Sequence, residues 1–215
     1  MKTRSGDPKA ANIKWLVMLA LLDAAAVLLF VAPELVDAGK LAIMRAGAAA
    51  VLPVVVLLLT GLLSHKVKAR LVYWKTANPL PGSAAFTKHA PADARIDMKA
   101  LAKNVGVLPA DPGEQNVKWY KLYRMVSDDP AVAHAHKLHL MYRDMAAMSL
   151  LLMPLVPAAL WYFGAPPSSR WIAGGLFALQ YVVCAIGARH SGTRFVCNVL
   201  AFHSTTKVKA TPASP

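Results

Sequence analysis

Cysteine and charge are both scarce in this 215-residue chain, and each shortage excludes a class of protein. The two cysteines, Cys184 and Cys197, are too few for a disulfide framework and lack the spacing of a zinc site. Charged residues make up only 16% of the chain against 56% hydrophobic residues, a composition too apolar for an ordinary soluble domain. A Walker loop, a dinucleotide-binding fingerprint, a nucleophile elbow and a His-Glu-x-x-His zinc motif are also missing, which removes the common soluble enzyme classes.

What the chain does contain is four apolar stretches, at residues 15–36, 41–63, 146–164 and 171–190. A helical run of about 20 apolar residues matches the roughly 30 Å hydrocarbon core of a bilayer. The sequence therefore predicts an all-α integral membrane protein with four transmembrane helices in two antiparallel hairpins. A small helical cytoplasmic domain is expected between the second and third spans, at residues 64–145. The expected cytoplasmic ends are residues 1–14 and 191–215, the latter disordered at its end.

The basic residues predict the orientation of these spans. The formal net charge is +13, and 21 of the 24 Lys and Arg residues fall in segments 1–14, 64–145 and 189–215. Because Lys and Arg are retained on the cytoplasmic side, we expect a multi-pass protein of the cell inner membrane with both termini in the cytoplasm. Nucleic acid is a less favoured partner, since no base-stacking or groove-reading motif accompanies the charge. A signal peptide cleaved after Ala38 is an alternative that leaves the other three spans oriented as before.

Proline and capping residues divide the inserted domain into helices. Residues 65–75 are expected to continue the second span beyond the headgroups as one helix. Three further helices are predicted from their N-caps, one from Asp97 to before Gly106, one from Asp111 to about Met125, and one from Asp129 into the third span. Residues 195–202 are predicted to form a separate short helix that returns along the inner surface of the membrane.

The helix predicted after Asp111 has two faces. Its aromatic and aliphatic side chains share one stripe, and its Lys and Arg side chains lie on the opposite side. Such a helix either lies on anionic headgroups or packs in a domain core with a solvated basic face. Together with one arginine after the fourth span, it supplies the expected surface for inner-leaflet lipid or a protein partner: Lys118, Trp119, Lys121, Arg124 and Arg194.

Two polar residues lie inside the predicted spans, Asp23 in the first and Gln180 in the fourth. At a rise of ~1.5 Å per residue they lie roughly 13–15 Å from the inner ends of their spans, so we expect a hydrogen bond between them. The favoured interpretation is a polar contact that fixes helix packing. A small transporter or channel centred on Asp23 is an alternative, because intramembrane carboxyl groups can carry protons or ions.

A second alternative is a membrane-embedded enzyme that acts on a lipid-like or quinone-like substrate at the inner leaflet. Its candidate residues gather at the inner ends of the third and fourth spans: His136, His139, Arg143, Asp144, Arg189 and His190. His134 points away from the other two histidines of this cluster on a helix, so three convergent zinc ligands are not expected. We therefore predict no metal and no cofactor.

The leading hypothesis is a non-enzymatic membrane protein that forms homo-oligomers. Small residues at 24–26, 46–50 and 174–175 allow close approach of helices in lipid. The cytoplasmic helices would bind a partner or a signal and couple it to the membrane bundle, in a regulatory, scaffolding or membrane-effector role. The plan of four spans with one cytoplasmic insert is similar to membrane components of bacterial antiviral systems. This resemblance of architecture implies bacterial defence as one form of the role.

A reporter fused after residue 100 tests the orientation. Because the basic residues flank the predicted inner ends of the spans, a reporter that is active only in the cytoplasm should be active at this position. The same reporter fused within residues 165–170 should be silent and serves as the control. A periplasmic signal at position 100, or a purified chain that stays dissolved without detergent, would contradict the prediction.

Overall fold

The computed structural model describes residues 12–35 and 40–206, and the regular structure of these residues is entirely helical. It contains the α-helices α1 (Ile13–Leu35), α2 (Lys40–Leu62), α3 (His65–Tyr73), α4 (Met98–Val105), α5 (Pro112–Met125), α6 (Pro130–Tyr162) and α7 (Pro167–Thr205). Between α3 and α4, a 3₁₀ turn at Pro81–Ala84 and a π turn at Ala85–His89 form what we call the 81–89 segment. The predicted all-helical class is confirmed for the described residues.

Several of these helices can cross a membrane. By length and composition α1, α6 and α7 qualify, and a fourth span is present if the second half of α2 and α3 are counted as one bent pair. Three to four candidate spans in the described residues support a membrane protein with several spans. The alternative cleavage position after Ala38 and both chain ends, residues 1–11 and 207–215, lie outside the described part.

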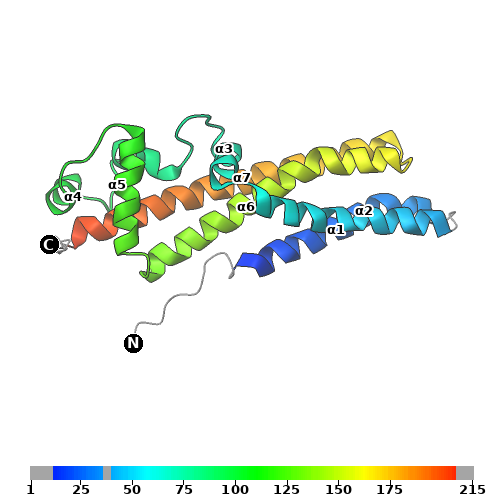
Figure 1. The fold of residues 1–215 in the computed structure, drawn as a ribbon, viewed down its shortest axis with the longest axis horizontal. Coiled ribbons are helices and arrows are strands. Elements are labelled where there is room, and N and C mark those ends of the chain that lie inside the picture. The colour runs from blue at the N-terminus through cyan, green and yellow to red at the C-terminus, as the bar shows by residue number, and fades with distance from the viewer. Residues whose placement is uncertain (1–11, 36–39, 207–215) are drawn as a thin grey trace.

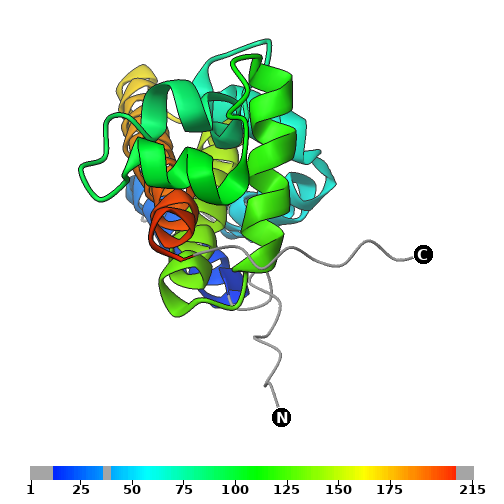
Figure 2. The same ribbon diagram turned by 90° about the vertical axis from the view of Figure 1, so that its left-hand side faces the viewer.

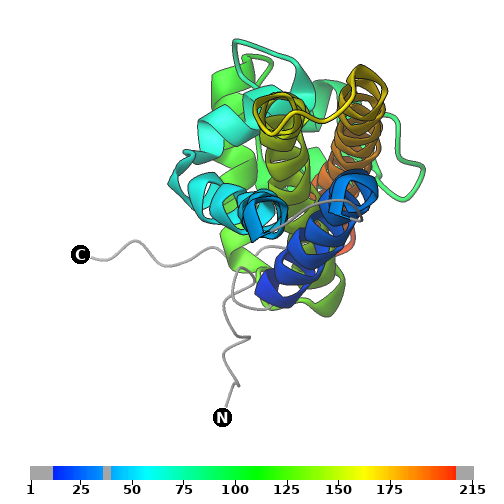
Figure 3. The ribbon, with the colours of Figure 1, turned by 90° about the vertical axis from the view of Figure 1, so that its right-hand side faces the viewer.

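The helices divide the molecule into two halves along its long axis (Figure 1). The apolar half contains α1, α2 and the ends of α6 and α7 that meet at residues 163–166. The polar half contains α4, α5, the 81–89 segment and the opposite ends of α6 and α7, and α3 lies between the halves. Figure 3 shows the apolar half end-on, with the α1–α2 pair beside the α6–α7 pair.

The apolar half has a packed interior and an apolar exterior. Its interior is a cluster around Phe177 of α7, with Met148 and Leu152 of α6, all of them fully buried. Its outward faces expose large aliphatic side chains, for example Leu58, which is 70% exposed, and Leu179, which is 63% exposed. An apolar surface of this extent marks contact with lipid or with another protein rather than with water.

The helices α6 and α7 run without a break through both halves. They contain 33 and 39 residues, so at ~1.5 Å per residue they extend roughly 50–60 Å. The prediction of a separate helix at 195–202 is wrong, because these residues continue α7. Phe195, Val196 and Leu200 are buried in the polar half, and this packing stabilises the continuation of α7 beyond Gly192. The tail was also predicted to be disordered from Ser204 onward, yet Ser204 and Thr205 are still helical.

The segment that follows α2 does not continue that helix, which corrects a second prediction. Ser64 acts as the N-cap of a new helix, since its Oγ accepts a hydrogen bond of 3.3 Å from the Val67 N–H. The axis of α3 consequently meets that of α2 at 111°. At its other end α3 stops at Trp74, whose left-handed backbone (φ 52°) turns the chain away.

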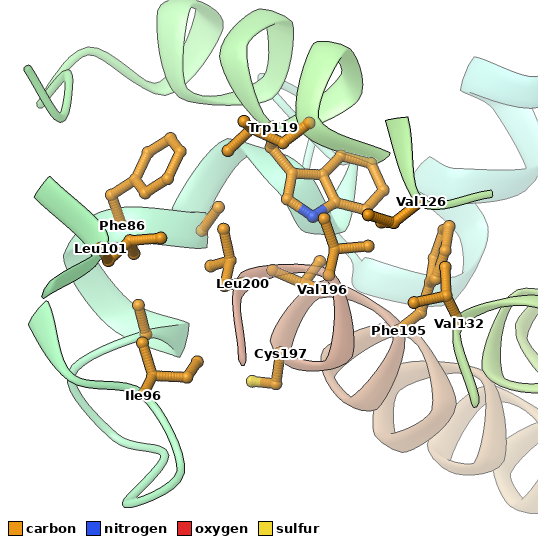
Figure 4. Close-up of a cluster of buried hydrophobic side chains, with 14 of the residues drawn as sticks. Phe86, Ile96, Leu101, Trp119, Val126, Val132, Phe195, Val196, Cys197 and Leu200 are labelled. Atoms are coloured by element: carbon orange, nitrogen blue, oxygen red, sulfur yellow. The ribbon is translucent and has the colours of Figure 1, made fainter. Parts of the chain in front are cut away.

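In the polar half, α4, α5 and the 81–89 segment gather around the end of α7 (Figure 2). Asp97, Asp111 and Asp129 accept hydrogen bonds from the first turns of α4, α5 and α6, so the three predicted helix starts are confirmed. Side chains from all of these elements form one buried cluster, drawn in Figure 4: among them Phe86, Leu101, Trp119, Phe195 and Leu200.

Gln115 attaches the 81–89 segment to α5. It is 1% exposed, and its Oε1 accepts hydrogen bonds from the backbone N–H groups of Phe86 (3.0 Å) and Thr87 (3.3 Å). Its Nε2 donates to the Ala110 carbonyl at 2.8 Å. One buried amide side chain thus provides the acceptor for two backbone donors where the 3₁₀ turn gives way to the π turn.

Replacing Gln115 by leucine should destabilise the polar half. Gln115→Leu leaves two backbone N–H groups without an acceptor, so we expect the free energy of unfolding to fall by about 2–4 kcal/mol. Thermal unfolding followed by circular dichroism measures the effect. Glu114→Gln, at the exposed neighbouring side chain, is the matched control. Equal melting temperatures for the two variants would disprove the role given to Gln115.

Candidate functional site

The helix α3 lies across α6 and α7 at the boundary of the two halves (Figure 1). Its inner face packs closely because the opposing side chains are small: Val72 is fully buried against Ala146 of α6 and Ala185 of α7. Polar groups surround this contact on both sides. We call them the α3 junction, made up of His65, Lys68, Tyr73, Trp74, Arg143, Asp144, Tyr181 and Arg189.

Ionic contacts join α3 to α6. The Asp144 carboxylate accepts hydrogen bonds from Lys68 Nζ at 3.1 Å and from Arg143 Nη2 at 2.8 Å. Arg143 also donates from Nη1 to His65 Nδ1 at 3.0 Å. The side chains of Lys68 and Arg143 are only 8% and 6% exposed, so both cations depend on this one carboxylate for compensation.

Hydrogen bonds and a stacked cation join α3 to α7. Arg189 Nε donates to the Val72 carbonyl at 2.6 Å, and the Arg189 guanidinium lies 3.6 Å from the centre of the Trp74 ring. Tyr181 donates from its hydroxyl to the Leu71 carbonyl at 2.6 Å and accepts from Trp74 Nε1 at 2.7 Å. The last carbonyl groups of a helix lack a hydrogen-bond donor within the helix. In α3, side chains of α7 donate to two of these carbonyls.

The Tyr73 ring enters the groove between α6 and α7 at Gly192. A Cβ atom at Gly192 would lie 2.0 Å from the Tyr73 hydroxyl, so only glycine fits there. His139 of α6 lies beside the same glycine and donates from Nδ1 to the Ala188 carbonyl at 3.0 Å. The Tyr73 hydroxyl itself is buried and has no hydrogen-bond partner among the described residues.

Three cavities adjoin the junction, and two of them are larger than 500 Å³. The first has a volume of about 570 Å³ and lies between the end of α3, the 81–89 segment and α7. We call it the cationic cavity, because Lys75, Lys88 and Arg189 line it and no Asp or Glu does. His89 lines it as well, and burial, reinforced by the charges of Lys88 and Lys75, lowers the pKa of His89, which disfavours the charged imidazole.

The second cavity, which we call the aromatic cavity, has a volume of about 630 Å³ and lies between α5, α6 and Leu80–Pro81. Its walls combine aromatic rings with basic groups, Tyr120 and Tyr123 on one side and Arg143 on the other. The His136 ring stacks on Phe195 at an interplanar angle of 11°.

The residues of the enzymatic alternative do not converge on one point. His136, His139 and Arg143 line the aromatic cavity, whereas Arg189 lines the cationic cavity. Arg189 also lines a third hollow of about 460 Å³ together with His190 and Arg194, and Asp144 lines none of these three. Within residues 12–35 and 40–206 no group of His, Cys, Asp and Glu side chains could hold a metal ion.

The surface predicted on α5 is present only in part. Trp119 is 6% exposed and belongs to the core, so its place in the partner surface is wrong. Lys118 is drawn toward the Val107 carbonyl, to which its Nζ donates, and partial burial lowers the pKa of Lys118. Lys121 and Arg124 are exposed, as is Arg194 of α7. The aromatic stripe of α5 is therefore packed against the core, whereas Lys121 and Arg124 on its basic face remain exposed.

The intramembrane pair is in contact. Gln180 Nε2 donates to Asp23 Oδ1 at 3.0 Å and to Oδ2 at 3.3 Å, which links α1 to α7 inside the apolar half. Asp23 is 3% exposed. The hydrogen bond expected from the matching depths of the two residues is confirmed.

Several residues of the site were not identified from the sequence: His65, Tyr73, Trp74 and Tyr181 of the junction, and three lysines. Lys68, Lys75 and Lys88 belong to a run of basic residues that served only to orient the chain. Lys68 pairs with a carboxylate 76 positions later, and the cationic cavity joins segments more than 100 residues apart. No local spacing signals such contacts, although the absence of acidic residues between 64 and 92 could have been noted.

Comparison of the chain with protein-family models, with curated proteins and with solved structures gives no match.

Removing the Asp144 carboxylate should destabilise the junction more than removing either cation. Asp144→Asn leaves two buried cations without a counter-charge, and we expect a loss of about 3–5 kcal/mol in the free energy of unfolding. Lys68→Met keeps the Asp144–Arg143 pair and should cost less. Chemical denaturation in detergent gives both values. If Lys68→Met proved as damaging as Asp144→Asn, the shared carboxylate would not be the central contact.

Proposed function

We propose that this protein is a non-enzymatic, homo-oligomeric inner-membrane protein whose cytoplasmic helical unit binds a ligand or partner and couples it to the membrane bundle. The bundle would consist of four spans in two hairpins, one made of α1 and α2 and the other of the apolar ends of α6 and α7. The polar half and both termini would face the cytoplasm. The role would be regulatory, scaffolding or that of a membrane effector, including an effector in bacterial defence.

The observation that carries this proposal is the α3 junction. Only residues 63–64 separate α3 from α2, and α3 is tied to α6 through Asp144 and to α7 through Arg189. A displacement of α6 or α7 in the polar half would therefore be transmitted to the end of α2. Coupling between distant sites needs an element that both sites bias, and α3 touches both halves.

The environment of the junction supports an orientation with α3 at the inner headgroups. Trp74 is 60% exposed there, and Trp is enriched at membrane interfaces. Lys66 and Arg70 are exposed on the same helix. Lys and Arg near the end of a span favour the cytoplasmic side and attract anionic lipid.

Two further surfaces support contact with other molecules. Gly175 of α7 has open space around the position of a Cβ atom, so the backbone of a second copy could approach it closely. The exposed basic face of α5, with Lys121 and Arg124, fits an acidic protein partner or anionic lipid.

Cutting the link between α3 and α6 should uncouple the halves. Spin labels at Leu58→Cys on α2 and Lys121→Cys on α5, both exposed positions, report the distance between them; Cys184 and Cys197 are buried. In the full chain in nanodiscs, we expect a narrow distance distribution that Lys68→Met broadens, because α3 loses its ion pair with α6. Double electron–electron resonance gives the distribution.

Two controls make the result specific. Lys66→Met removes an exposed lysine from the same helix and should leave the distribution narrow. A label pair at Lys103→Cys and Lys121→Cys, both within the polar half, should not respond to Lys68→Met. An unchanged α2–α5 distribution in Lys68→Met would refute coupling through α3.

A further inference from the structure

The cationic cavity gathers positive charge that the protein does not neutralise. Lys75, Lys88 and Arg189 contribute to its walls from three separate segments, and none of them takes part in the ion pairs of the described residues. Like charges that share one cavity repel each other, so this arrangement raises the energy of the empty site. An anion in the cavity would remove that cost.

Arg189 is held in place at the wall of this cavity. Its Nε donates to the Val72 carbonyl, and its guanidinium carbon lies 3.6 Å from the centre of the Trp74 ring. The Arg189 Nη2 atom is buried and has no hydrogen-bond partner among the described residues. A buried guanidinium nitrogen without an acceptor is costly, because cations in proteins are normally paired.

We propose that the cationic cavity binds a phosphate-bearing anion, held by Lys75, Lys88 and Arg189 between the end of α3, the 81–89 segment and α7. This inference rests on the proposed function and names the chemical class of its ligand. The phosphate group comes from the headgroup of an inner-leaflet lipid or from a small soluble phosphate, since both present the same oxygens.

The composition of the cavity favours phosphate over a single carboxylate. Three cations match the charge of a phosphate monoester or a diphosphate better than they match one negative charge, and a fixed guanidinium suits phosphate geometry. The hydroxyl-bearing residues Ser83 and Thr193 also line the cavity. Its volume of about 570 Å³ lies within the range of small-molecule sites.

Binding at this place would act on the α3 junction. Arg189 belongs to the junction and to the cavity, and Tyr73 of α3 lines the cavity as well. A ligand held by Arg189 on α7 and by Lys75 just after α3 therefore draws the two elements together. The bound state would strengthen the link between the polar half and α2.

Pyrophosphate titration of the full chain in nanodiscs of zwitterionic phosphatidylcholine tests the site, with sodium chloride of equal ionic strength as reference. We expect the melting temperature to rise by about 5 °C at saturation, because a ligand that binds only the folded state stabilises it. A second arm replaces part of the phosphatidylcholine by phosphatidic acid. A rise in the first arm assigns the ligand to soluble phosphates, and a rise in the second arm alone assigns it to the lipid headgroup.

Paired substitutions locate the binding. Lys75→Gln with Lys88→Gln removes two exposed side chains of the cavity without touching the hydrogen bonds of Arg189, and should weaken pyrophosphate or phosphatidic acid binding by about tenfold or more. Lys99→Gln with Lys103→Gln removes the same charge from exposed lysines of α4 outside the cavity and should change binding less than about twofold. Equal losses in the two double variants, or no response to either ligand, would overturn the proposal.

The result separates the site from the coupling. If neither ligand binds but Lys68→Met still broadens the α2–α5 distance distribution, the phosphate site is refuted and the coupling stands. If a ligand binds with the expected pattern but the distribution does not respond to Lys68→Met, the phosphate site stands and the coupling is refuted.

Discussion

The Asp144 carboxylate is the contact on which the arrangement of the two halves depends. It is the acidic group shared by Lys68 of α3 and Arg143 of α6, both of which are almost fully buried. Two cations around one carboxylate leave the junction with an excess of one positive charge, and Arg189 adds another nearby. Such a surplus is expensive away from water, and it is most easily tolerated where anions are abundant, as at an anionic membrane surface. The same electrostatics that hold α3 in place thus account for a site that attracts anions.

Small residues allow this polar junction to form between tightly packed helices. Gly192 gives the Tyr73 hydroxyl its place, and a Cβ atom at Gly187 would lie 2.9 Å from the Tyr142 ring. Ala146, Ala185 and Ala188 provide the flat surface against which Val72 of α3 is buried. In a bundle where the helix exteriors meet lipid, association is driven by close packing and interhelical hydrogen bonds rather than by the exclusion of water. The α3 junction combines close packing with interhelical hydrogen bonds.

The sequence predicted those features that are determined locally. The caps at Asp97, Asp111 and Asp129 mark helix starts because each depends on the residue itself and the next three. The contact between Asp23 and Gln180 could be predicted from their depths in the predicted spans, since the number of residues along a helix gives a distance directly. Apolar length in the same way indicated α1, α6 and α7 as candidate spans.

The features that were missed or wrong depend on contacts distant in sequence. A basic, amphipathic α3 is compatible with an extension of α2, and it is the pairing with Asp144 and Arg189 that holds it across α6 and α7. Residues 195–202 have the composition of an interfacial helix, yet their apolar side chains complete the core of the polar half as part of α7. The cationic cavity likewise exists only because three remote segments meet.

The interhelical hydrogen bonds also indicate which helices move together. Asn12 at the start of α1 donates to the Lys137 carbonyl of α6 at 2.7 Å, and Asp23 of α1 is bonded to Gln180 of α7. The described side chains of α2 make no hydrogen bond or ion pair to another helix, and α2 contacts its neighbours through apolar packing such as that of Val56. Apolar contacts are non-directional and permit sliding more readily than hydrogen bonds of fixed geometry. A change at the α3 junction would therefore shift α2 against a unit formed by α1, α6 and α7, and α2 is the helix on which a signal from the polar half would first act.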